Sequence, residues 1–562
     1  MIEDGRKRTE VKADGVRWRV APEWRSLLFG PHGLRLQEWL HGGQAHVVKH
    51  GPHRTVYRVA LPDFIFYLKH YRLSGLRAWL RQLVRPPKAR TEFERALAVA
   101  NRAVPTIVPV ALGEGCARPG PSDSFLITRA LDTAESVAQF IEHTLPRLDG
   151  QQRARLSQRL AVGLGAFVAQ LHASGVVHRD FHPANLLLLF DDADRPHIHL
   201  VDLDSVRLRA PLSGRARREN LVILNRWSML RVSRSDRLRF WFAYCRAHAC
   251  LRGHEVRDWA RKLERASLDS NFRFWQNRDR RCLTSNRYYR RCRSRAVAGY
   301  AVGDLDSHAL EHLLMDPDAP FRDSQRRLLK DSPSSTVVEL ELLVNGVPRR
   351  VIYKRFRVKS WTDPWRALLR RTPALRSWIY GHGLRERLLP TARPLAVFHR
   401  RGGFLSYEGY LLTEKIENAL DLHAYGERLA TLPGGQRQGL LRGRIEQIAG
   451  LLRTLHARRL SHRDLKAANI LVTDQQAWFI DLVGVAPCRQ LTLGQRLKNL
   501  ARLHASFHDH AMLTRTDKLR FLRTYQEWGI FGRVGWKECW RALEKATRAK
   551  VARNARNHRP LA

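Results

Sequence analysis

Hydrophobic positions change their spacing along the chain, and the same change occurs twice. The segments TVYRVALPDFIFYLK (55–69) and TVVELELLVNGVPRRVIYK (336–354) have the composition of β-strands, and each is interrupted by a turn signal, LPD or NGV. Each segment therefore predicts a β-hairpin. After Asp149 and after Gly435 apolar residues recur at helical spacing instead. The pattern predicts a small sheet followed by a mainly helical lobe, two times over.

Landmark residues confirm that the chain is a duplication. His178-Arg179-Asp180 recurs as His462-Arg463-Asp464, at an offset of 462 − 178 = 284 residues. Four further pairs follow in the same order at offsets of 279 to 285: Lys69 and Lys354, Asp202 and Asp481, Asn220 and Asn499, Asp236 and Asp517. A repeat of this length is a plausible size for a two-lobed domain. We expect a first domain over 1–268 and a second over 269–562, with the boundary after the last helical segment of the first.

The charge of the chain bears on its partners. The 99 lysines and arginines exceed the 53 aspartates and glutamates by 99 − 53 = 46. Such a surface attracts a phosphorylated glycolipid, an acidic membrane leaflet or nucleic acid, unless it is basic without a dedicated partner. The seven scattered cysteines do not suggest a disulfide framework, and the first residues lack the apolar core of a signal peptide. We therefore expect a cytoplasmic location.

Two short motifs carry candidate chemistry. VVHRDFHPANLLL places Asp180 and Asn185 five residues apart, and LSHRDLKAANILV repeats the spacing with Asp464 and Asn469. This H-R-D-x-x-x-x-N pattern resembles the catalytic loop of protein kinases and their relatives. The resemblance implies that the aspartates accept the proton of an attacking hydroxyl and that the asparagines hold Mg²⁺.

An apolar strand ending in aspartate follows each loop. HLVDLD ends near Asp202 and WFIDLVG contains Asp481, at the place of the D-F-G aspartate that binds Mg²⁺ in kinases. Leucine replaces the phenylalanine in both copies, and the glycine is Asp204 in the first copy and Val483 in the second. A phenylalanine-based switch is therefore not expected, whereas metal binding is.

The resemblance also assigns residues to the nucleotide. Lys69 and Lys354 correspond to the strand lysine that contacts the phosphates. Glu92 lies 92 − 69 = 23 residues after Lys69, where a helix glutamate orients that lysine, and Glu94 is the alternative for that role. The same step from Lys354 reaches Ser377, so the second copy is expected to be weak or degenerate.

The loop that covers the phosphates is a poor match. The first copy has one glycine there, Gly51, and the second has none. Lys466, two residues after Asp464, is typical of Ser/Thr protein kinases and is expected to contact the nucleotide, as is Gly51. The first copy has His182-Pro183 at the matching place, as small-molecule kinases often do.

Taken together, YLKHYR, VPTIVPVALGE, HRDFHPANLLL and VDLDSV most resemble the lipopolysaccharide kinases, which phosphorylate Kdo or heptose sugars. The resemblance implies an α+β fold of two tandem protein-kinase-like bilobal domains, each with a β-rich N-lobe and a larger helical C-lobe. It implies ATP and Mg²⁺ as cofactors and an anionic glycolipid, the lipopolysaccharide core, as substrate. Contact with the inner face of the inner membrane would be peripheral.

Two alternatives stay open at this point. One is a Ser/Thr protein kinase in which one copy regulates the other, as Lys466 suggests. The other is a non-catalytic protein that binds an anionic glycan or nucleic acid through its arginines, although nucleic acid is not the expected partner.

Overall fold

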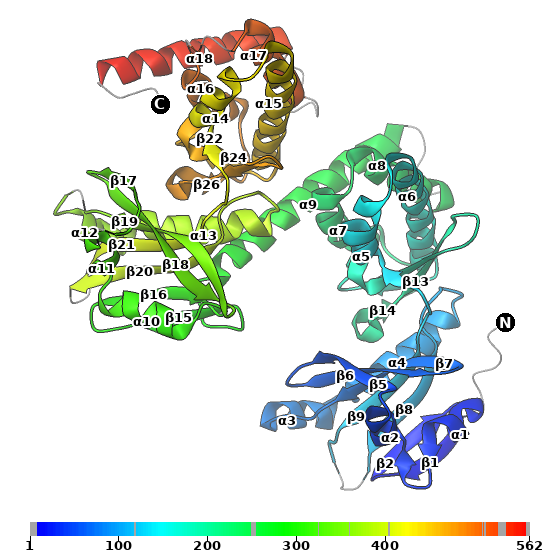
Figure 1. Ribbon diagram of the computed structural model, residues 1–562. Coiled ribbons are helices and arrows are strands. Elements are labelled where there is room, and N and C mark those ends of the chain that lie inside the picture. The colour runs from blue at the N-terminus through cyan, green and yellow to red at the C-terminus, as the bar shows by residue number, and fades with distance from the viewer. Residues whose placement is uncertain are drawn as a thin grey trace. The chain divides into compact units, whose positions relative to one another are not determined.

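The computed structural model describes residues 8–116, 120–248, 254–323, 325–358, 360–402, 405–508, 510, 513–526 and 535–557. The chain divides into two compact units, Met1–Leu268 and Asp269–Ala562 (Figure 1). The boundary lies inside helix α9 (His254–Arg281). Our expectation that this helix ends near residue 268 is wrong, because Trp275 and Asp279 continue it and are buried against the second unit's own residues.

The first unit begins with a seven-stranded antiparallel sheet. Its order is β1-β2-β8-β9-β7-β6-β5, formed by Thr9–Ala13, Val16–Val20, Pro109–Gly115, Ser124–Arg129, Phe64–Tyr71, Arg54–Leu61 and Ala45–His50. Two helices, α3 (Leu76–Val84) and α4 (Lys88–Ala100), follow β7, and small elements connect β2 to β5: η1 (Pro22–Trp24), α1 (Arg25–Leu28), β3 (Phe29–Gly30), β4 (Gly33–Leu34) and α2 (Leu36–His41). The predicted hairpin is confirmed as β6 and β7, in a register that pairs Val56 with Lys69.

The second part of this unit is mainly helical, as the pattern predicts. Its large helices are α6 (Gly150–Ala173), α7 (Gly214–Arg231), α8 (Arg234–His248) and the first part of α9. Between them lie short elements: β10 (Glu135–Ser136), α5 (Val137–Gln139), η2 (Phe140–Thr144), η3 (Leu145–Arg147), β11 (Val176–His178), η4 (Pro183–Asn185), β12 (Leu186–Phe190), β13 (Pro196–Leu200), η5 (Leu203–Ser205) and β14 (Val206–Leu208).

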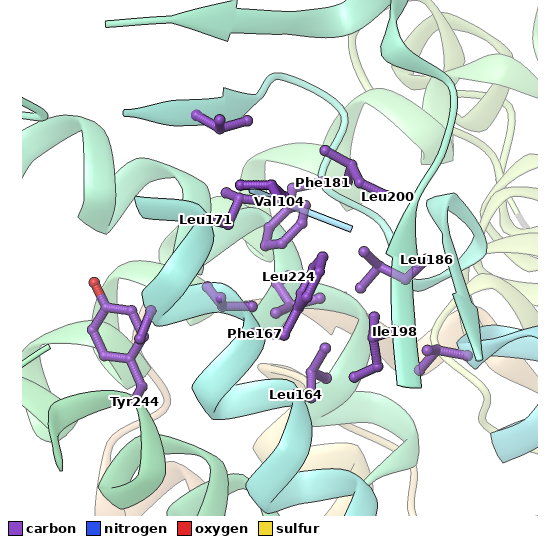
Figure 2. Close-up of a cluster of buried hydrophobic side chains, with 14 of the residues drawn as sticks. Val104, Leu164, Phe167, Leu171, Phe181, Leu186, Ile198, Leu200, Leu224 and Tyr244 are labelled. Atoms are coloured by element: carbon purple, nitrogen blue, oxygen red, sulfur yellow. The ribbon is translucent and has the colours of Figure 1, made fainter. Parts of the chain in front are cut away.

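A hydrophobic cluster holds this helical lobe together and fixes the loop that carries Asp180. Figure 2 shows Phe167 and Leu171 of α6 near Phe181, with Leu186 and Ile198 from the short strands. Phe181 is fully buried. Because Phe181 directly follows Asp180, its burial anchors the chain at the point where the aspartate leaves the core.

The second unit repeats the arrangement. Its sheet has the order β15-β16-β20-β21-β19-β18-β17, formed by Tyr289–Arg293, Val297–Val302, Pro394–Gly402, Leu405–Glu414, Val347–Phe356, Ser335–Val344 and Leu328–Ser332. This is the order of the first sheet strand for strand, which bears out the duplication. The predicted hairpin is β18 and β19, joined through Asn345 and Gly346, both with positive φ as a tight hairpin turn requires.

The remaining elements of the second unit also follow the first. They are α10 (Ser307–Met315), α11 (Ala319–Arg322), α12 (Asp363–Leu369), α13 (Pro373–Glu386), β22 (Leu420–Asp421), α14 (Leu422–Ala430), α15 (Gly434–Ala457), β23 (Leu460–His462), η6 (Ala467–Asn469), β24 (Ile470–Val472), β25 (Ala477–Phe479), η7 (Leu482–Gly484), β26 (Val485–Pro487), α16 (Leu493–Ala505), α17 (Arg515–Gln526) and α18 (Trp536–Arg556). Within the described ranges, none of the helices has the length and apolar character needed to cross a membrane.

Candidate active site

The first copy presents Asp180 on a tight, internally bonded loop between β11 and η4. The Asn185 side-chain amide donates to the carbonyl oxygen of Asp180 over 2.8 Å. The backbone N–H of His182 donates to the same oxygen over 2.7 Å. The Asp180 side chain itself is exposed. The loop therefore holds an unburied carboxylate in a fixed place, which is what a general base requires.

Asp202 is brought next to this loop by backbone contacts. The N–H of Val201 donates to the carbonyl oxygen of Asn185 over 3.0 Å, and His178 Nε2 lies 3.1 Å from the carbonyl oxygen of Asp202. Asp202 has left-handed backbone angles, φ 60° and ψ 54°. A non-glycine residue keeps this conformation only where the surroundings enforce it, and such residues cluster at functional sites.

Lys69 and Glu92 form the ion pair that the kinase resemblance implies. Lys69 Nζ lies 2.5 Å from Glu92 Oε1, and Glu92 is fully buried on the inner side of α4. The second carboxylate oxygen of Glu92 accepts a hydrogen bond from the Tyr71 hydroxyl over 2.6 Å. Both oxygens are thus satisfied, as a buried carboxylate requires.

Tyr71 and Arg54 belong to the same site, and the sequence analysis missed both. Burial and the neighbouring Glu92 carboxylate raise the pKa of Tyr71, so its hydroxyl stays a donor. The Arg54 guanidinium lies over the Tyr71 ring at 5.8 Å and reaches to 3.9 Å from Asp202 Oδ1. Alternation along β7 could have identified Tyr71, because residues two apart in a strand share a face. Arg54 follows only from the strand register, which pairs it with Tyr71.

Gly51 lies in the turn between β5 and β6. A β-carbon added there would approach the nearest atom, the carbonyl oxygen of Arg54, at 3.5 Å, which is an ordinary contact. The turn is closed by Thr55 and His50, whose side chains lie 3.2 Å apart. The local geometry does not require glycine at this position, so its role toward a nucleotide stays a prediction.

The catalytic loop of the second copy has the same shape with one difference. The Asn469 amide donates to the carbonyl oxygen of Asp464 over 2.7 Å and also to its carboxylate over 3.1 Å. Asp464 is exposed, and Asp481 again has left-handed angles, φ 52° and ψ 65°. Lys466 precedes η6 and is half-buried. Its assignment to the nucleotide also stays a prediction.

Lys354 has a different partner from Lys69. Its Nζ lies 3.2 Å from Asp481 Oδ2, the aspartate expected to bind metal. Ser377, at the position of Glu92, is buried on α13 and turns its hydroxyl to the carbonyl oxygen of Pro373 at 3.0 Å. Phe356 stands two residues after Lys354, where the first copy has Tyr71, and its ring lies 4.7 Å from the lysine Nζ.

A buried polar network supports each catalytic loop from behind. In the first copy His172 lies 3.0 Å from the Tyr244 hydroxyl and 3.1 Å from Asn220 Oδ1, and the Asn220 amide donates to the carbonyl oxygen of His178 over 2.5 Å. Burial lowers the pKa of His172 to about 4, so the imidazole is neutral at pH 7.

The second copy keeps the network with altered bonds. His456 lies 2.5 Å from the Tyr525 hydroxyl, and Asn499 Oδ1 accepts the backbone N–H of His462 over 2.7 Å. Asn220 and Asn499 are repeat landmarks in the sequence, but their place behind the catalytic loops comes from the structure alone.

The oxygen donors of the first copy fit Mg²⁺ with nucleotide phosphates. Asn185 and Asp202 are neighbours through the backbone bond at Val201, and Mg²⁺ is usually bound by one or two carboxylates together with phosphates. In the part of the chain that the structure describes, no group of three or more histidine, cysteine, aspartate or glutamate side chains forms a self-sufficient metal cluster. The donor set therefore suits a metal that arrives with a phosphorylated ligand.

A small sheet, a larger helical lobe and this site define a protein-kinase-like protein, here in two copies. The family model of the lipopolysaccharide kinase (Kdo/WaaP) family matches residues 42–244 and 332–525, one stretch in each copy. The two stretches make up more than half of the chain, so the chain belongs to the lipopolysaccharide kinase (Kdo/WaaP) family.

Curated relatives carry names from the same family. A 3-deoxy-D-manno-octulosonic acid kinase of Mannheimia succiniciproducens is 34% identical over 125 residues, covering 21% of this chain and 47% of the relative. The Haemophilus influenzae protein of the same name is 38% identical over 103 residues, covering 17% and 39%. The lipopolysaccharide core heptose(I) kinase WaaP of Pseudomonas aeruginosa is 28% identical over 165 residues, covering 28% and 59%. The chain spans about half the length of the curated relatives it matches.

Part of the chain is also similar to a solved structure. A structure described as WaaP in complex with acyl carrier protein is 24% identical, covers 44% of this chain and 99% of that chain, and has a TM-score of 0.33.

Proposed function

We propose that this chain is an ATP-dependent kinase that phosphorylates a sugar hydroxyl of the lipopolysaccharide core, and that the first copy carries out the reaction. The observation that carries the proposal is the Lys69–Glu92 pair of the first copy, which Tyr71 and Arg54 connect to Asp202. In the second copy Lys354 contacts Asp481 instead. Membership of the lipopolysaccharide kinase family supports the sugar acceptor. The excess of 46 positive charges favours a polyanionic glycolipid.

Each residue of the first copy has a proposed part. Asp180 accepts the proton of the acceptor hydroxyl at its exposed carboxylate, which makes the oxygen a better nucleophile. Lys69 binds phosphate oxygens, and Glu92 with Tyr71 keeps the ammonium group in position. Asn185 and Asp202 would hold Mg²⁺, and bound Mg·ATP would supply the phosphoryl group and neutralise its charge. His178 positions the backbone of Asp202 and does not contact substrate in this scheme.

The second copy is proposed to be weak or inactive in transfer. Lys354 neutralises Asp481, so the residue expected to bind metal already has a cation on it. Mg²⁺ would have to displace that lysine, and Ser377 offers no carboxylate to receive it. This copy therefore lacks the arrangement that separates the phosphate-binding lysine from the metal-binding aspartate.

The test is transfer of labelled γ-phosphate from ATP to a lipopolysaccharide extract. We would compare the unaltered chain with Asp180→Ala and with the matched change Asp464→Ala. Label in the glycolipid that is lost with Asp180→Ala and kept with Asp464→Ala is the expected result. Loss with Asp464→Ala alone would reverse the assignment of the active copy.

The acceptor is tested with lipopolysaccharides of defined core length. Incorporation into a core that contains Kdo but no heptose would indicate a Kdo hydroxyl, and a requirement for heptose would indicate the other sugar. Labelling of added protein substrates, with no labelling of either glycolipid, would contradict the sugar-kinase proposal.

A further inference from the structure

Helix α3 (Leu76–Val84) presents its apolar face to solvent. Leu76, Trp79, Leu80, Leu83 and Val84 are 72%, 41%, 51%, 55% and 87% exposed. Their spacing of three, four, seven and eight residues from the first places them on one side of the helix. A surface helix ordinarily turns such a stripe toward the core, but no residue of α3 is buried. We call these five residues the apolar stripe of α3.

The rest of α3 is basic and lightly attached to its own lobe. Arg77, Arg81 and Arg85 are exposed and recur every four residues, beside and opposite the stripe. The side-chain amide of Gln82 donates to the carbonyl oxygen of Ser122 over 2.9 Å, which ties the helix to the sheet. This combination, an apolar face against an arginine face, is typical of helices that lie in a membrane surface.

The second copy has a stripe at the same place. Adding the 285-residue offset of the two lysines (354 − 69) to Leu76, Leu83 and Val84 gives Trp361, Leu368 and Leu369, which are 83%, 54% and 91% exposed. The same step from Arg81 and Arg85 gives Arg366 and Arg370, both exposed on or just after helix α12 (Asp363–Leu369). Leu80 corresponds to Trp365, which is 51% exposed, whereas Trp79 corresponds to Pro364, which is buried. The stripe therefore recurs in the second copy at four of its five positions, and we call Trp361, just before the helix, with Trp365, Leu368 and Leu369 the apolar stripe of α12.

The stripes keep their apolar character in both copies, whereas part of the phosphate site differs. Ser377 and Phe356 stand where the first copy has Glu92 and Tyr71, yet exposed apolar residues stand at four of the five stripe positions in both copies. Exposed apolar surface is unfavourable in water, and extended patches of it mark interaction sites. Neither stripe is explained by folding of its own lobe or by phosphate binding.

We propose that α3 and α12 are membrane-contact helices that lie in the headgroup region of a bilayer containing anionic phospholipid. The tryptophan and leucine side chains insert into the acyl boundary, and the arginines bind the lipid phosphates with their stems along the surface. The occupant is a lipid surface because each stripe is bordered by arginines within a chain of net charge +46. This inference concerns where the protein sits and does not depend on the proposed kinase activity.

Flotation of the full chain with lipid vesicles tests the proposal. One set contains phosphatidylcholine with phosphatidylglycerol, and the other phosphatidylcholine alone. The unaltered chain should float with the mixed set, and Leu80→Ser/Leu83→Ser combined with Leu368→Ser/Leu369→Ser should lower its bound fraction by about tenfold. Arg81→Gln/Arg85→Gln should reduce the preference for the anionic set.

The matched control removes exposed apolar side chains elsewhere. Val162 on α6 and Leu440 on α15 are 49% and 46% exposed, and Val162→Ser/Leu440→Ser should float like the unaltered chain. An unchanged melting temperature shows that each variant is folded.

Three results would overturn the proposal. The first is that the unaltered chain binds neither vesicle set, and the second is that the stripe variant and the control variant bind equally. The third is that the unaltered chain self-associates and that the stripe substitutions convert it to monomers without changing flotation. A second copy of the chain would then cover the stripes.

Discussion

Lys69 and Lys354 occupy the same strand position in the two copies and contact different acids. Lys69 contacts Glu92 on the neighbouring helix at 2.5 Å, whereas Lys354 contacts Asp481 at 3.2 Å. In the first copy Asp202, the counterpart of Asp481, lies 3.9 Å from the Arg54 guanidinium. In the first copy the lysine contacts a helix glutamate, and in the second it contacts the aspartate that we expect to bind metal.

The difference extends over a group of residues. By position along the strand, Tyr71 corresponds to Phe356, and by strand register Arg54 corresponds to Ser335, since these residues pair with Tyr71 and Phe356. Ser377 stands in the second copy where the first has the buried Glu92 carboxylate. The hydroxyl that bonds this carboxylate is absent from the second copy, and the lysine there contacts Asp481 instead. A buried carboxylate is stable only with its partners, so loss of the acid removes the reason to retain the tyrosine hydroxyl.

The largest expected effect comes from removing each lysine in turn. Lys69→Met should lower phosphate transfer by about 10²–10³-fold, because a preorganised cation facing the phosphates is lost. Lys354→Met should leave most activity, since that lysine is neutralised by Asp481. Initial rates with labelled ATP measure both. Equal losses from the two substitutions would remove the functional distinction between the copies.

A smaller loss is expected when only the orientation of Lys69 is disturbed. Glu92→Gln keeps an oxygen for the Tyr71 hydroxyl but removes the charge, which frees Lys69 to turn elsewhere. Transfer should fall by about tenfold to 10²-fold, with a raised KM for ATP. Glu94→Gln is the matched control, because Glu94 lies on the exposed side of the same helix. If Glu92→Gln behaves like this control, the ion pair has no part in the reaction.

The second copy can be altered toward the first. Ser377→Glu with Phe356→Tyr restores a carboxylate and a hydroxyl beside Lys354, which should draw the lysine from Asp481. In a Lys69→Met background, binding of a fluorescent ATP analogue should rise by about two- to tenfold, at the lower end of the coupling energies found between contacting groups. A melting curve shows whether the buried glutamate is tolerated. If the folded variant binds the ATP analogue no better, the weak binding of the second copy is not caused by Ser377 and Phe356.

The smallest expected difference concerns acid stability. Burial lowers the pKa of His172 in the first copy to about 4. In the second copy burial lowers the pKa of five histidines: to about 4 for His399, His462 and His504, and to about 3 for His382 and His456. The unfolded chain binds these protons near pH 6.5, so between that value and pH 4 it binds more protons than the folded chain. Stability should therefore fall as pH falls through this window, and more steeply for the second copy.

Pulse proteolysis across that pH range, with the fragments identified by mass spectrometry, assigns unfolding to each copy. A first copy that becomes cleavable before the second would contradict the expected order.

Local patterns in the sequence predicted much of this architecture. The turn between Asn345 and Gly346 and the strand composition on either side gave the second hairpin, and helical spacing gave α6 and α15. The Lys69–Glu92 ion pair was expected from the kinase resemblance, in which a helix glutamate orients the strand lysine. The extent of α9 was mispredicted, since its last turns are stabilised by contacts of Trp275 and Asp279 with residues far along the chain.

The sequence by itself determined that there are two copies, that each has a sheet and a helical lobe, and which residues form the two H-R-D loops. These features depend on periodicity, turns and short spacings, which are local. The structure decided that Lys354 contacts Asp481, that Tyr71 and Arg54 join the first site, and that α3 and α12 turn their apolar stripes outward. Those features depend on which distant segments pack together and on which face of each element they cover, and no local pattern encodes that choice.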